Sequence, residues 1–411
     1  MIGITRLYAD RNTPSDGLRY GRQQLEGVRT RDVLTCTPSR TAAERKPVVV
    51  WNVGRRCNLH CVHCYSDSAN RAFDGELTTD EGCALIRDLA QFEIPVLLLS
   101  GGEPLLRPDI FELIAEARAV RLRTTLSTNG TLITPAVAER IRAYGVSYVG
   151  ISFDGIGATN DRFRGHKGAF AEAMAGLRNC KAVGQRVGLR MTLTRRTCED
   201  LDSIFDFIEA EGIDRACFYH LVYSGRGNHA DELVPEVARA AVDTILRRTR
   251  DFADRGIAKE ILTVDNHADG PYLYLRLLEE DPARAAEVLD LLRWNGGGLN
   301  SSGVGIADID FLGNVHPDQF WMSHTLGNVR ERSFGSIWQD MSDPLLAGLR
   351  NRAPLLKGRC GVCRWKDVCG GSFRVRALQV YGDPWAEDPG CYLTDEECGL
   401  VPGSRMREPS A

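Results

Sequence analysis

The sequence has little that points to a membrane or to secretion. No apolar stretch approaches the roughly 20 residues that a membrane-spanning helix needs. The first ten residues contain no charged region followed by a long apolar core, so we expect no signal peptide. The net charge is also small, because 55 Asp and Glu residues against 51 Lys and Arg residues leave −4. This balance gives no indication of binding to nucleic acid or to an anionic membrane.

Cysteine, by contrast, is abundant. The chain has 13 cysteines in 411 residues, and most of them stand in metal-ligand spacings and not in the scattered pattern of disulfide partners. This grouping predicts reduced thiols and a cytoplasmic protein. The length allows more than one domain.

Three of the cysteines, Cys57, Cys61 and Cys64, have a C-x3-C-x2-C spacing directly after the apolar run 48–53. The run is typical of a buried strand, so we expect the three thiols at the C-terminal end of that strand. Thiolates are the ligands of iron–sulfur clusters, and three of them leave one iron of a cubane cluster open. An open coordination position is typical of a catalytic metal centre. A zinc site completed by His60 or His63 is the alternative.

Strand-like and helix-like patterns alternate through the first half of the chain. This repeat predicts a parallel sheet with right-handed helical crossovers. A curled partial barrel and an open doubly wound sheet both fit the pattern, and both place catalytic groups at the C-terminal ends of the strands. The predicted strands are 48–53, 95–100, 123–128, 147–153, 187–194 and 215–222, and the predicted helices are 79–92, 109–120, 135–143, 168–183 and 199–211.

Polar residues stand at the ends of these predicted strands. In Gly101-Gly102-Glu103-Pro104 the glycines allow a close backbone approach to a ligand, and the carboxylate can bind an ammonium group. A tight turn is the alternative. An arginine within a barrel strand is costly to bury alone, so Arg190 is expected to meet a carboxylate. The other polar candidates, which could also be strand caps, are Ser127, Asn129, Ser152 and Asp154.

The second half of the chain contains another cysteine group. Cys360, Cys363 and Cys369 have a C-x2-C-x5-C spacing, and Cys391 supplies a fourth thiol. Four thiols fill a cubane cluster, so this site should be closed and serve electron transfer or structure. Zinc is again the alternative. The remaining cysteines, at 36, 83, 180, 198, 217 and 398, are interpreted as structural or incidental.

Between the two halves lies a helical stretch, 231–295, interrupted by a polar loop. The loop 265–269 contains His267, and its crowded polar groups favour a substrate contact over a plain helix cap. Residues 303–310 and 313–318 predict a hairpin.

The first cysteine motif, its strand and the Gly101–Pro104 segment resemble the radical S-adenosylmethionine (SAM) enzymes. The resemblance implies a partial (β/α)6 TIM-like barrel, and a [4Fe-4S] cluster whose open iron binds the amino and carboxylate groups of SAM. Reductive cleavage of SAM then gives a 5′-deoxyadenosyl radical. The residues implied to bind SAM are Gly101, Gly102, Glu103, Ser127, Asn129, Ser152, Asp154 and Arg190, where Arg190 would meet the SAM carboxylate or Asp154.

The hairpin and the distal cysteines resemble the SPASM/Twitch extension of these enzymes. That extension often carries cysteines in the hairpin, but here Asp318 follows Pro317 where a cysteine is usual. The departure implies one auxiliary [4Fe-4S] cluster, hence two clusters in the chain. The predicted division is an N-terminal extension (1–46), the barrel (47–230), a helical bridging segment (231–295), the auxiliary-cluster domain (296–400) and a disordered tail (401–411).

Segments along nearly the whole chain resemble the 12,18-didecarboxysiroheme deacetylase family of siroheme-dependent haem biosynthesis. They include Lys46–Asn52, Phe218–Tyr223, Thr263–Tyr272, Val315–Trp321 and Cys391–Glu396. The resemblance implies removal of two acetate side chains from this tetrapyrrole, leaving methyl groups and giving iron-coproporphyrin III. The alternatives are a haem d1 enzyme acting on the same precursor, a peptide-modifying SPASM maturase, and a non-catalytic iron–sulfur or zinc protein.

A tetrapyrrole with several carboxylates calls for arginines, which bind carboxylates through two parallel hydrogen bonds. The candidates are Arg162, Arg164 and Arg226, and each could instead form an ordinary ion pair. His267 and His316 could ligate the substrate iron or donate a proton, or could be structural. An external electron donor such as a ferredoxin or flavodoxin is expected.

Overall fold

A computed structural model describes residues 1–20, 46–228 and 231–400, which form two compact units. We call them the barrel unit (Arg40–Asp231 and Ser302–Ala347) and the auxiliary unit (Met1–Ser39, Glu232–Ser301 and Gly348–Ala411).

This division differs from the predicted domains. The hairpin predicted within 296–400 belongs with the barrel, and the distal cysteines belong with the helices of the predicted bridging segment. The predicted disordered tail, 401–411, lies outside the described residues, as do residues 21–45 of the predicted extension.

The barrel unit is built on the parallel sheet that the sequence predicts. Its strands follow one another in space as they do in the chain, each parallel to the next. Such strands are covered on both faces, which explains the nearly continuous apolar run of the first one. The strands are β2 (Val48–Asn52), β3 (Leu97–Ser100), β4 (Thr124–Thr128), β5 (Val149–Ser152), β6 (Val187–Leu193) and β7 (Arg215–His220).

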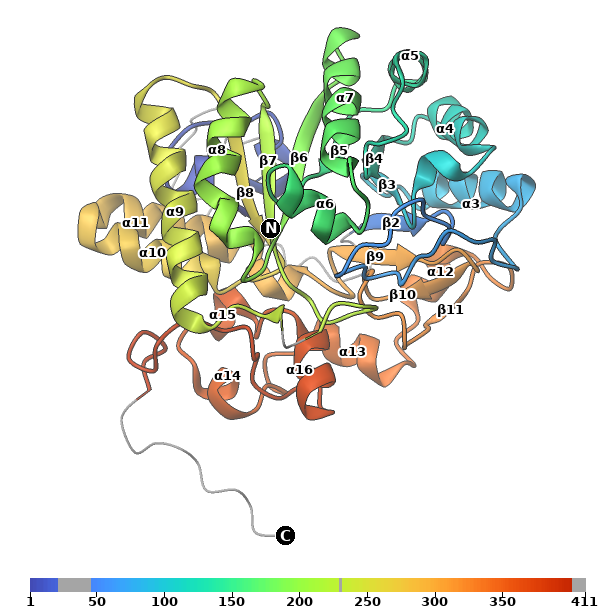
Figure 1. The fold of residues 1–411 in the computed structure, drawn as a ribbon. Coiled ribbons are helices and arrows are strands. Elements are labelled where there is room, and N and C mark those ends of the chain that lie inside the picture. The colour runs from blue at the N-terminus through green and yellow to red at the C-terminus, as the bar shows by residue number, and fades with distance from the viewer. Residues whose placement is uncertain (21–45, 229–230, 401–411) are drawn as a thin grey trace. The chain divides into compact units, whose positions relative to one another are not determined.

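Helices connect these strands, and Figure 1 shows α3, α4, α5 and α7 outside the strands β2 to β5. Helix α3 begins at a capping box. The Thr78 side chain accepts a hydrogen bond from the Glu81 N–H, and the Glu81 side chain accepts one from the Thr78 N–H. The buried face of α3 packs closely: a Cβ on Gly82 would lie 2.9 Å from Trp51 and 2.7 Å from Leu113. The helices are α3 (Thr79–Gln91), α4 (Ile110–Ala119), α5 (Pro135–Ala143), α6 (Ala158–Arg164), α7 (Ala169–Ala182) and α8 (Leu201–Ala210).

The predicted hairpin extends the barrel sheet. Its first strand, β9 (Ile306–Ile309), pairs in parallel with β2, and β10 (Asn314–His316) pairs antiparallel with β9. A further short strand, β11 (Gly327–Asn328), pairs with β10. β2 therefore has partners on both sides, β3 and β9. Helices α12 (Phe334–Gln339) and α13 (Pro344–Arg350) follow.

The auxiliary unit contains a strand that the sequence did not predict. β8 (Glu260–Val264) is buried along its whole length and pairs antiparallel with β1 (Ile2–Gly3). Periodicity cannot separate such a short apolar run from the helical patterns around it. The unit's helices are α1 (Ile4–Leu7), α2 (Asp16–Tyr20), α9 (Pro235–Asp254), α10 (Asp269–Glu280), α11 (Pro282–Asn295), α14 (Gly358–Val362), α15 (Lys366–Cys369) and α16 (Arg374–Tyr381).

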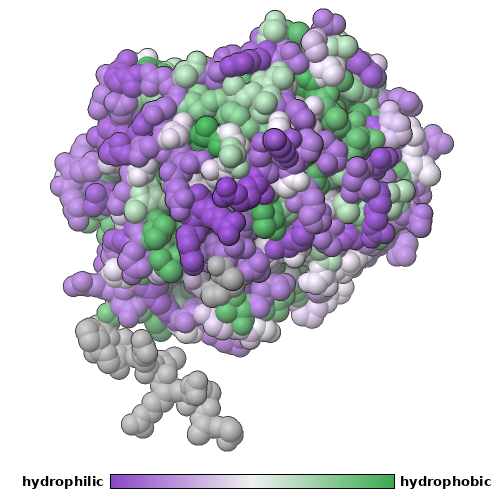
Figure 2. Space-filling view, viewed as in Figure 1, coloured by the Kyte–Doolittle hydropathy of each residue, from purple (hydrophilic) through white to green (hydrophobic). Residues whose placement is uncertain are grey.

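Hydrophilic residues cover most of the face seen in Figure 2, with the apolar residues in smaller areas between them. Among the described residues, no helix combines the length and apolar character needed to cross a membrane.

Candidate active site

The cysteine loop, Cys57–Cys64, follows the C-terminal end of β2, as the sequence predicts. Backbone hydrogen bonds fix it to neighbouring segments: Cys57 N donates to Ala69 O (3.1 Å) and His60 N donates to Arg164 O (3.2 Å). Cys57 is buried, and Cys61 and Cys64 are half-buried. The loop is thus held on a rigid strand with its thiols gathered at the sheet's carboxyl edge.

Hydrogen-bond donors point at each of the three sulfurs. Leu59 N donates to Cys57 Sγ and Ser68 N donates to Cys64 Sγ, both at 3.4 Å. Arg164 Nη1 donates to Cys61 Sγ at 3.6 Å. Burial raises the pKa of the Cys57 thiol to about 12, so a bound metal must displace the proton to obtain the thiolate. Donors arranged in this way fit thiolates that ligate an iron–sulfur cluster.

The spacing of ligands also bears on zinc. Within the described part of the chain, no three His, Cys, Asp or Glu side chains converge as ligands of one metal ion.

Gly101 and Gly102 lie close to the backbone that leads into the cysteine loop. A Cβ on Gly101 would lie 2.4 Å from Gly54 O, and one on Gly102 would lie 2.1 Å from Arg56 O. Gly101 also has a φ of +129°, which favours glycine. The sequence suggested a close approach to a ligand. The structure shows a close approach to the backbone that leads into the cysteine loop.

Glu103 is buried at the centre of this region. Its carboxylate accepts hydrogen bonds from Leu105 N (3.1 Å), Thr128 Oγ1 (2.8 Å) and Asn129 N (2.8 Å). Burial raises the pKa of Glu103 although these donors oppose the rise. A cation beside the carboxylate would favour its ionised form. The residue is therefore oriented by the end of β4 and suited to hold an ammonium group.

The polar residues of β4 and β6 also contact one another. Asn129 Nδ2 donates to Asn58 Oδ1 (2.9 Å) and lies 3.8 Å from Cys57 Sγ, so it is tied to the cysteine loop. Arg190 Nη1 donates to Ser127 Oγ (2.7 Å), and its guanidinium lies 4.7 Å from the ring of Tyr219.

Asp154 forms a different ion pair from the predicted one. Arg190 was one expected partner, but Asp154 Oδ2 accepts from Arg164 Nη2, and its Oδ1 accepts from Thr192 N at 2.6 Å. Asp154 and Arg164 are both largely buried. Arg164, predicted as a ligand of substrate carboxylates, instead joins Asp154 to the Cys61 sulfur. Ser152 ends β5, paired in register with Arg190.

Arg226, the predicted substrate contact in the loop after β7, supports the cysteine loop. Its Nε donates to Cys61 O, and its Nη1 donates to Asp67 Oδ1 and to Ser68 O, all at 2.9 Å. These contacts fix the guanidinium of Arg226 beside the cysteine loop.

The loop 265–269 lies in the auxiliary unit, where its polar groups have local partners. Asn266 Nδ2 donates to Gly390 O (2.8 Å), and Asp269 Oδ1 accepts from Tyr392 OH (2.6 Å). Helix α10 begins after Ala268, whose N–H donates to Asn266 Oδ1 at 3.1 Å. His267 is buried against Phe373, with ring centroids 5.6 Å apart, and burial holds its pKa well below the usual value.

His316, the other predicted catalytic histidine, lies on β10 in the barrel unit and is 1% exposed. Its Nδ1 lies 2.7 Å from His324 O, and its Nε2 lies 3.5 Å from Asp310 Oδ2. Burial opposes the charged imidazolium, but Asp310, the negative charge of Asp308 and the contact with His324 O together outweigh burial and raise the pKa of His316.

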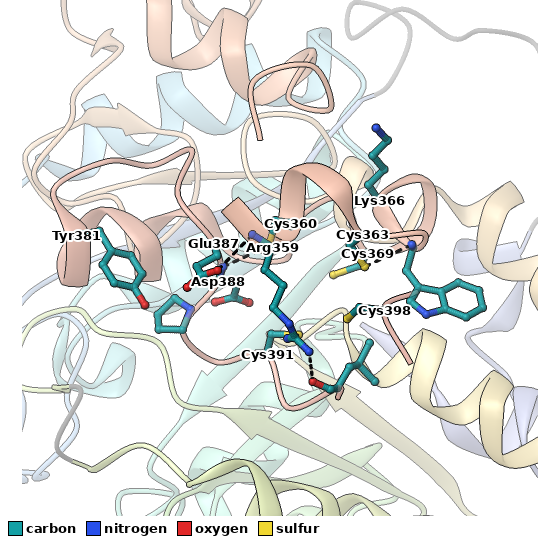
Figure 3. Close-up of a pocket in the computed structure, with 14 residues that line it drawn as sticks. Arg359, Cys360, Cys363, Lys366, Cys369, Tyr381, Glu387, Asp388, Cys391 and Cys398 are labelled. Atoms are coloured by element: carbon teal, nitrogen blue, oxygen red, sulfur yellow. Dashed lines mark hydrogen bonds between the residues drawn. The ribbon is translucent and has the colours of Figure 1, made fainter. Parts of the chain in front are cut away.

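The second cysteine group lines a cavity of about 180 Å³ in the auxiliary unit (Figure 3). That volume is many times the roughly 10–15 Å³ of one water-sized probe, so it accommodates more than one ion. The predicted ligands Cys360, Cys363, Cys369 and Cys391 all line it, as does Cys398, which the sequence analysis set aside as incidental. A hydrogen bond from Cys398 lowers the pKa of Cys363 to about 7.

One residue of the site, Tyr65, and one contact, that of Arg164 with Cys61, were not predicted, and they differ in how far the sequence could reveal them. Tyr65 follows Cys64 directly, and its buried hydroxyl donates to Asn52 Oδ1 (2.7 Å); its place beside the motif was an available signal. Arg164 reaches Cys61 from about a hundred residues along the chain, and no local pattern marks that contact.

Comparison with known proteins supports the class that the fold and the cysteine loop define. The family model described as the Radical SAM superfamily matches residues 51–208. A crystal structure of Streptococcus suis SuiB bound to the precursor peptide SuiA has a similar fold, with a TM-score of 0.67. It is 18% identical, and the likeness covers 95% of this chain and 82% of that one. The class is that of the radical SAM enzymes.

Relatives of higher sequence identity show to which radical SAM family the chain belongs. Fe-coproporphyrin III synthase of Methanosarcina barkeri is 54% identical over 97% of this chain and 99% of the relative. Pre-heme d1 synthase of Dinoroseobacter shibae is 47% identical over 89% of this chain and 91% of the relative. The chain belongs to the radical SAM family that contains these two synthases.

Proposed function

We propose that this protein removes the two acetate side chains of 12,18-didecarboxysiroheme to give iron-coproporphyrin III. The observation that carries the proposal is the 54% identity with Fe-coproporphyrin III synthase over nearly the full length of both chains. The match spans segments of both units, so it includes residues well outside the radical SAM region at 51–208.

In the proposed mechanism, Cys57, Cys61 and Cys64 hold a [4Fe-4S] cluster beside bound SAM. Together these groups supply a 5′-deoxyadenosyl radical, an oxidant strong enough for an unactivated carbon. Glu103, oriented by Thr128 and the Asn129 backbone, holds the methionyl ammonium group. The remaining proposed SAM contacts are Gly101, Gly102, Ser127, Asn129, Ser152, Asp154 and Arg190.

A second [4Fe-4S] cluster, ligated by Cys360, Cys363, Cys369 and Cys391, is part of the proposal. The volume of the cavity, about 180 Å³, supports a cluster over a single zinc ion. Such a cluster would carry electrons to or from the reaction. A ferredoxin or flavodoxin would supply them in the reducing cytoplasm, where thiols stay free.

His267, His316 and Arg226 remain proposed contacts of the tetrapyrrole. A neutral imidazole is a common iron ligand, and the low pKa of His267 keeps its ring neutral. The raised pKa of His316 suits a proton donor. His267→Ala and His316→Ala should leave both clusters and uncoupled SAM cleavage intact, and at least one should lower deacetylation by more than ~10-fold. Wild-type turnover in both would make these histidines structural.

The reaction is tested by anaerobic incubation of reconstituted protein with SAM, a reductant and 12,18-didecarboxysiroheme. Mass spectrometry should detect iron-coproporphyrin III, with 5′-deoxyadenosine formed alongside it. The Cys57→Ala, Cys61→Ala, Cys64→Ala variant is the matched control and should form neither. A product that keeps both acetates would contradict the proposal.

A haem d1 reaction on the same precursor is the second candidate, favoured by the 47% identity with pre-heme d1 synthase. The same incubation separates the two, because that reaction would give a product other than iron-coproporphyrin III. A peptide-modifying activity is less favoured, because the mycofactocin maturase MftC of Mycobacterium tuberculosis is 32% identical over 88% of this chain, against 54% for Fe-coproporphyrin III synthase.

A further inference from the structure

The hydrogen-bond donors to the sulfurs of the second cysteine group differ in charge. Backbone N–H groups, which are neutral, donate to Cys360 Sγ at 3.3 Å and to Cys363 Sγ at 3.4 Å. Arg359 Nη1 donates to Cys391 Sγ at 3.2 Å, and Figure 3 shows its side chain beside that cysteine. The donor to Cys391 therefore carries a full positive charge, and the donors to the other two sulfurs do not.

The guanidinium of Arg359 is fixed in one orientation. Its Nη2 donates to Leu393 O, and its Nε donates to Asp395 Oδ1 at 2.8 Å. With the bond to Cys391, all three guanidinium nitrogens bind to the segment 391–395. A planar guanidinium presents these donors in a fixed geometry, which the single ammonium group of a lysine cannot do. The hydrogen bond to the sulfur is therefore built into the fold of this segment.

Asp395 compensates the charge of Arg359 only in part. The side chain of Asp395 is 65% exposed, and that of Arg359 is 21% exposed. Water and salt screen the exposed carboxylate more than they screen the half-buried guanidinium. A positive field from the guanidinium therefore remains at the Cys391 sulfur.

The backbone on both sides of Cys391 is held as well. Asn266 Nδ2 donates to Gly390 O at 2.8 Å. On the other side, the Tyr392 hydroxyl donates to Asp269 Oδ1 at 2.6 Å. The sulfur and its cationic donor are thus both fixed. A guanidinium in this position stabilises a thiolate, which is the form that binds iron.

We propose that Arg359 is a positioning residue that holds Cys391 as a thiolate ligand and makes the second cluster easier to reduce. The inference rests on the second cluster of the proposed function. Reduction adds one electron from the external donor, forms and breaks no bond, and leaves one more negative charge on the cluster. A cation and a hydrogen bond at a ligand sulfur stabilise that added charge. Arg359 therefore raises the reduction potential.

The test measures iron content and the redox titration of the second cluster by electron paramagnetic resonance. The background is the full chain with the three cysteines of the first group replaced by alanine, so that only the second cluster gives a signal. Arg359→Gln removes the charge and keeps an N–H donor, and Arg359→Lys keeps the charge. Arg364→Gln is the matched control, because Arg364 follows Cys363 directly but its guanidinium lies over the Trp365 ring, 4.5 Å from the centroid.

We expect about four irons in the background and in all three variants, as one cubane requires. Arg359→Gln should shift the potential to a more negative value by about 59 mV, which is tenfold for a one-electron couple. Arg359→Lys should give a smaller shift in the same direction, because the ammonium group keeps the charge but cannot make all three contacts. Arg364→Gln should stay close to the background value.

An unchanged potential in Arg359→Gln would overturn the inference, as would an equal shift in Arg364→Gln, since the effect would then come from total charge. Loss of iron from Arg359→Gln but not from Arg359→Lys would support it, because the cation would then be needed to hold the thiolate. Loss of iron from both would make Arg359 a purely structural residue and overturn it. Absence of iron from the background protein is a separate failure, because it would remove the proposed cluster itself.

Discussion

Arg164 connects the end of β5 with the cysteine loop in the first site. Its guanidinium contacts Asp154 and the sulfur of Cys61, and its carbonyl accepts from His60 in the cysteine loop. A lysine has a single ammonium group and cannot present two separate donors in a fixed plane. The ion pair therefore sets the position of the cysteine loop as well as its charge.

Removing Arg164 should destabilise the barrel unit. Arg164→Ala leaves Asp154, 1% exposed, as a buried unpaired charge, and breaking such a pair costs about 3–5 kcal/mol. Anaerobic denaturant unfolding of the reconstituted protein measures the loss. The double variant Arg164→Ala, Asp154→Asn should be more stable than Arg164→Ala alone. Equal stabilities of the two variants would show that the pair is not the cause.

The two cysteine groups should respond differently to single substitutions. Cys61→Ala should abolish cleavage of SAM, because it removes a ligand of the cluster with the open iron. Cys363→Ala should keep at least part of the uncoupled cleavage, since it affects only the second group. The measurement is 5′-deoxyadenosine formed per chain. Formation at the wild-type rate in Cys61→Ala would refute the assignment of the first group.

His316 should titrate above the usual histidine pKa of about 6.5. The interaction with Asp310 favours the charged ring despite burial, so its stabilisation is complete below the unfolded-state pKa and is lost as the pH rises through the folded-state pKa. Nuclear magnetic resonance of ring-labelled histidine in the metal-free protein measures the pKa. Asp310→Asn should lower it, and an equal pKa in both proteins would exclude Asp310 as the cause.

At the scale of elements, the polar residues of the loop 265–269 are explained by the segment that they contact. Its polar crowding is visible in the sequence and favours a substrate contact. Its partners, Gly390 and Tyr392, are more than a hundred residues away, so the sequence could not show that they flank a cysteine. The structure explains Asn266 and Asp269 as supports of Cys391.

Asn266→Ala should therefore lower the iron content of the second group and leave the first intact. Loss of its hydrogen bond to Gly390 O frees the backbone next to a ligand. Iron analysis and SAM cleavage, measured on one preparation, separate the two sites. Asn70→Ala, in the barrel unit, is a matched control. A full complement of iron in Asn266→Ala would show that the loop is not needed to hold the site.

The regular elements were the most predictable part of the fold. The six parallel strands of the barrel sheet and five of its helices fall within a few residues of their predicted ranges, because long periodic patterns specify them locally. β8 was missed because its short apolar run lies between stretches with a helical pattern. The partner of β9 was also beyond prediction, because strand pairing over some 250 residues leaves no local signal.

At the scale of the whole molecule, the two units carry separate cysteine groups, and each is proposed to hold a cubane. Anaerobic reconstitution should give about eight irons per chain, four for each cluster. Iron and sulfide analysis with a parallel zinc assay checks this. Zinc in the second group, with iron only in the first, would contradict half of the prediction.

The pairing of β9 with β2 has a consequence for the order of events during synthesis. β2 carries the first cysteine group, yet one of its two neighbours is made about 250 residues later, on the order of 10–50 s at typical ribosome speeds. Until then β2 is an exposed sheet edge, which is where growing chains aggregate. Iron loading before β9 is made would act on an unfinished sheet, so delivery of the first cluster should follow the synthesis of β9.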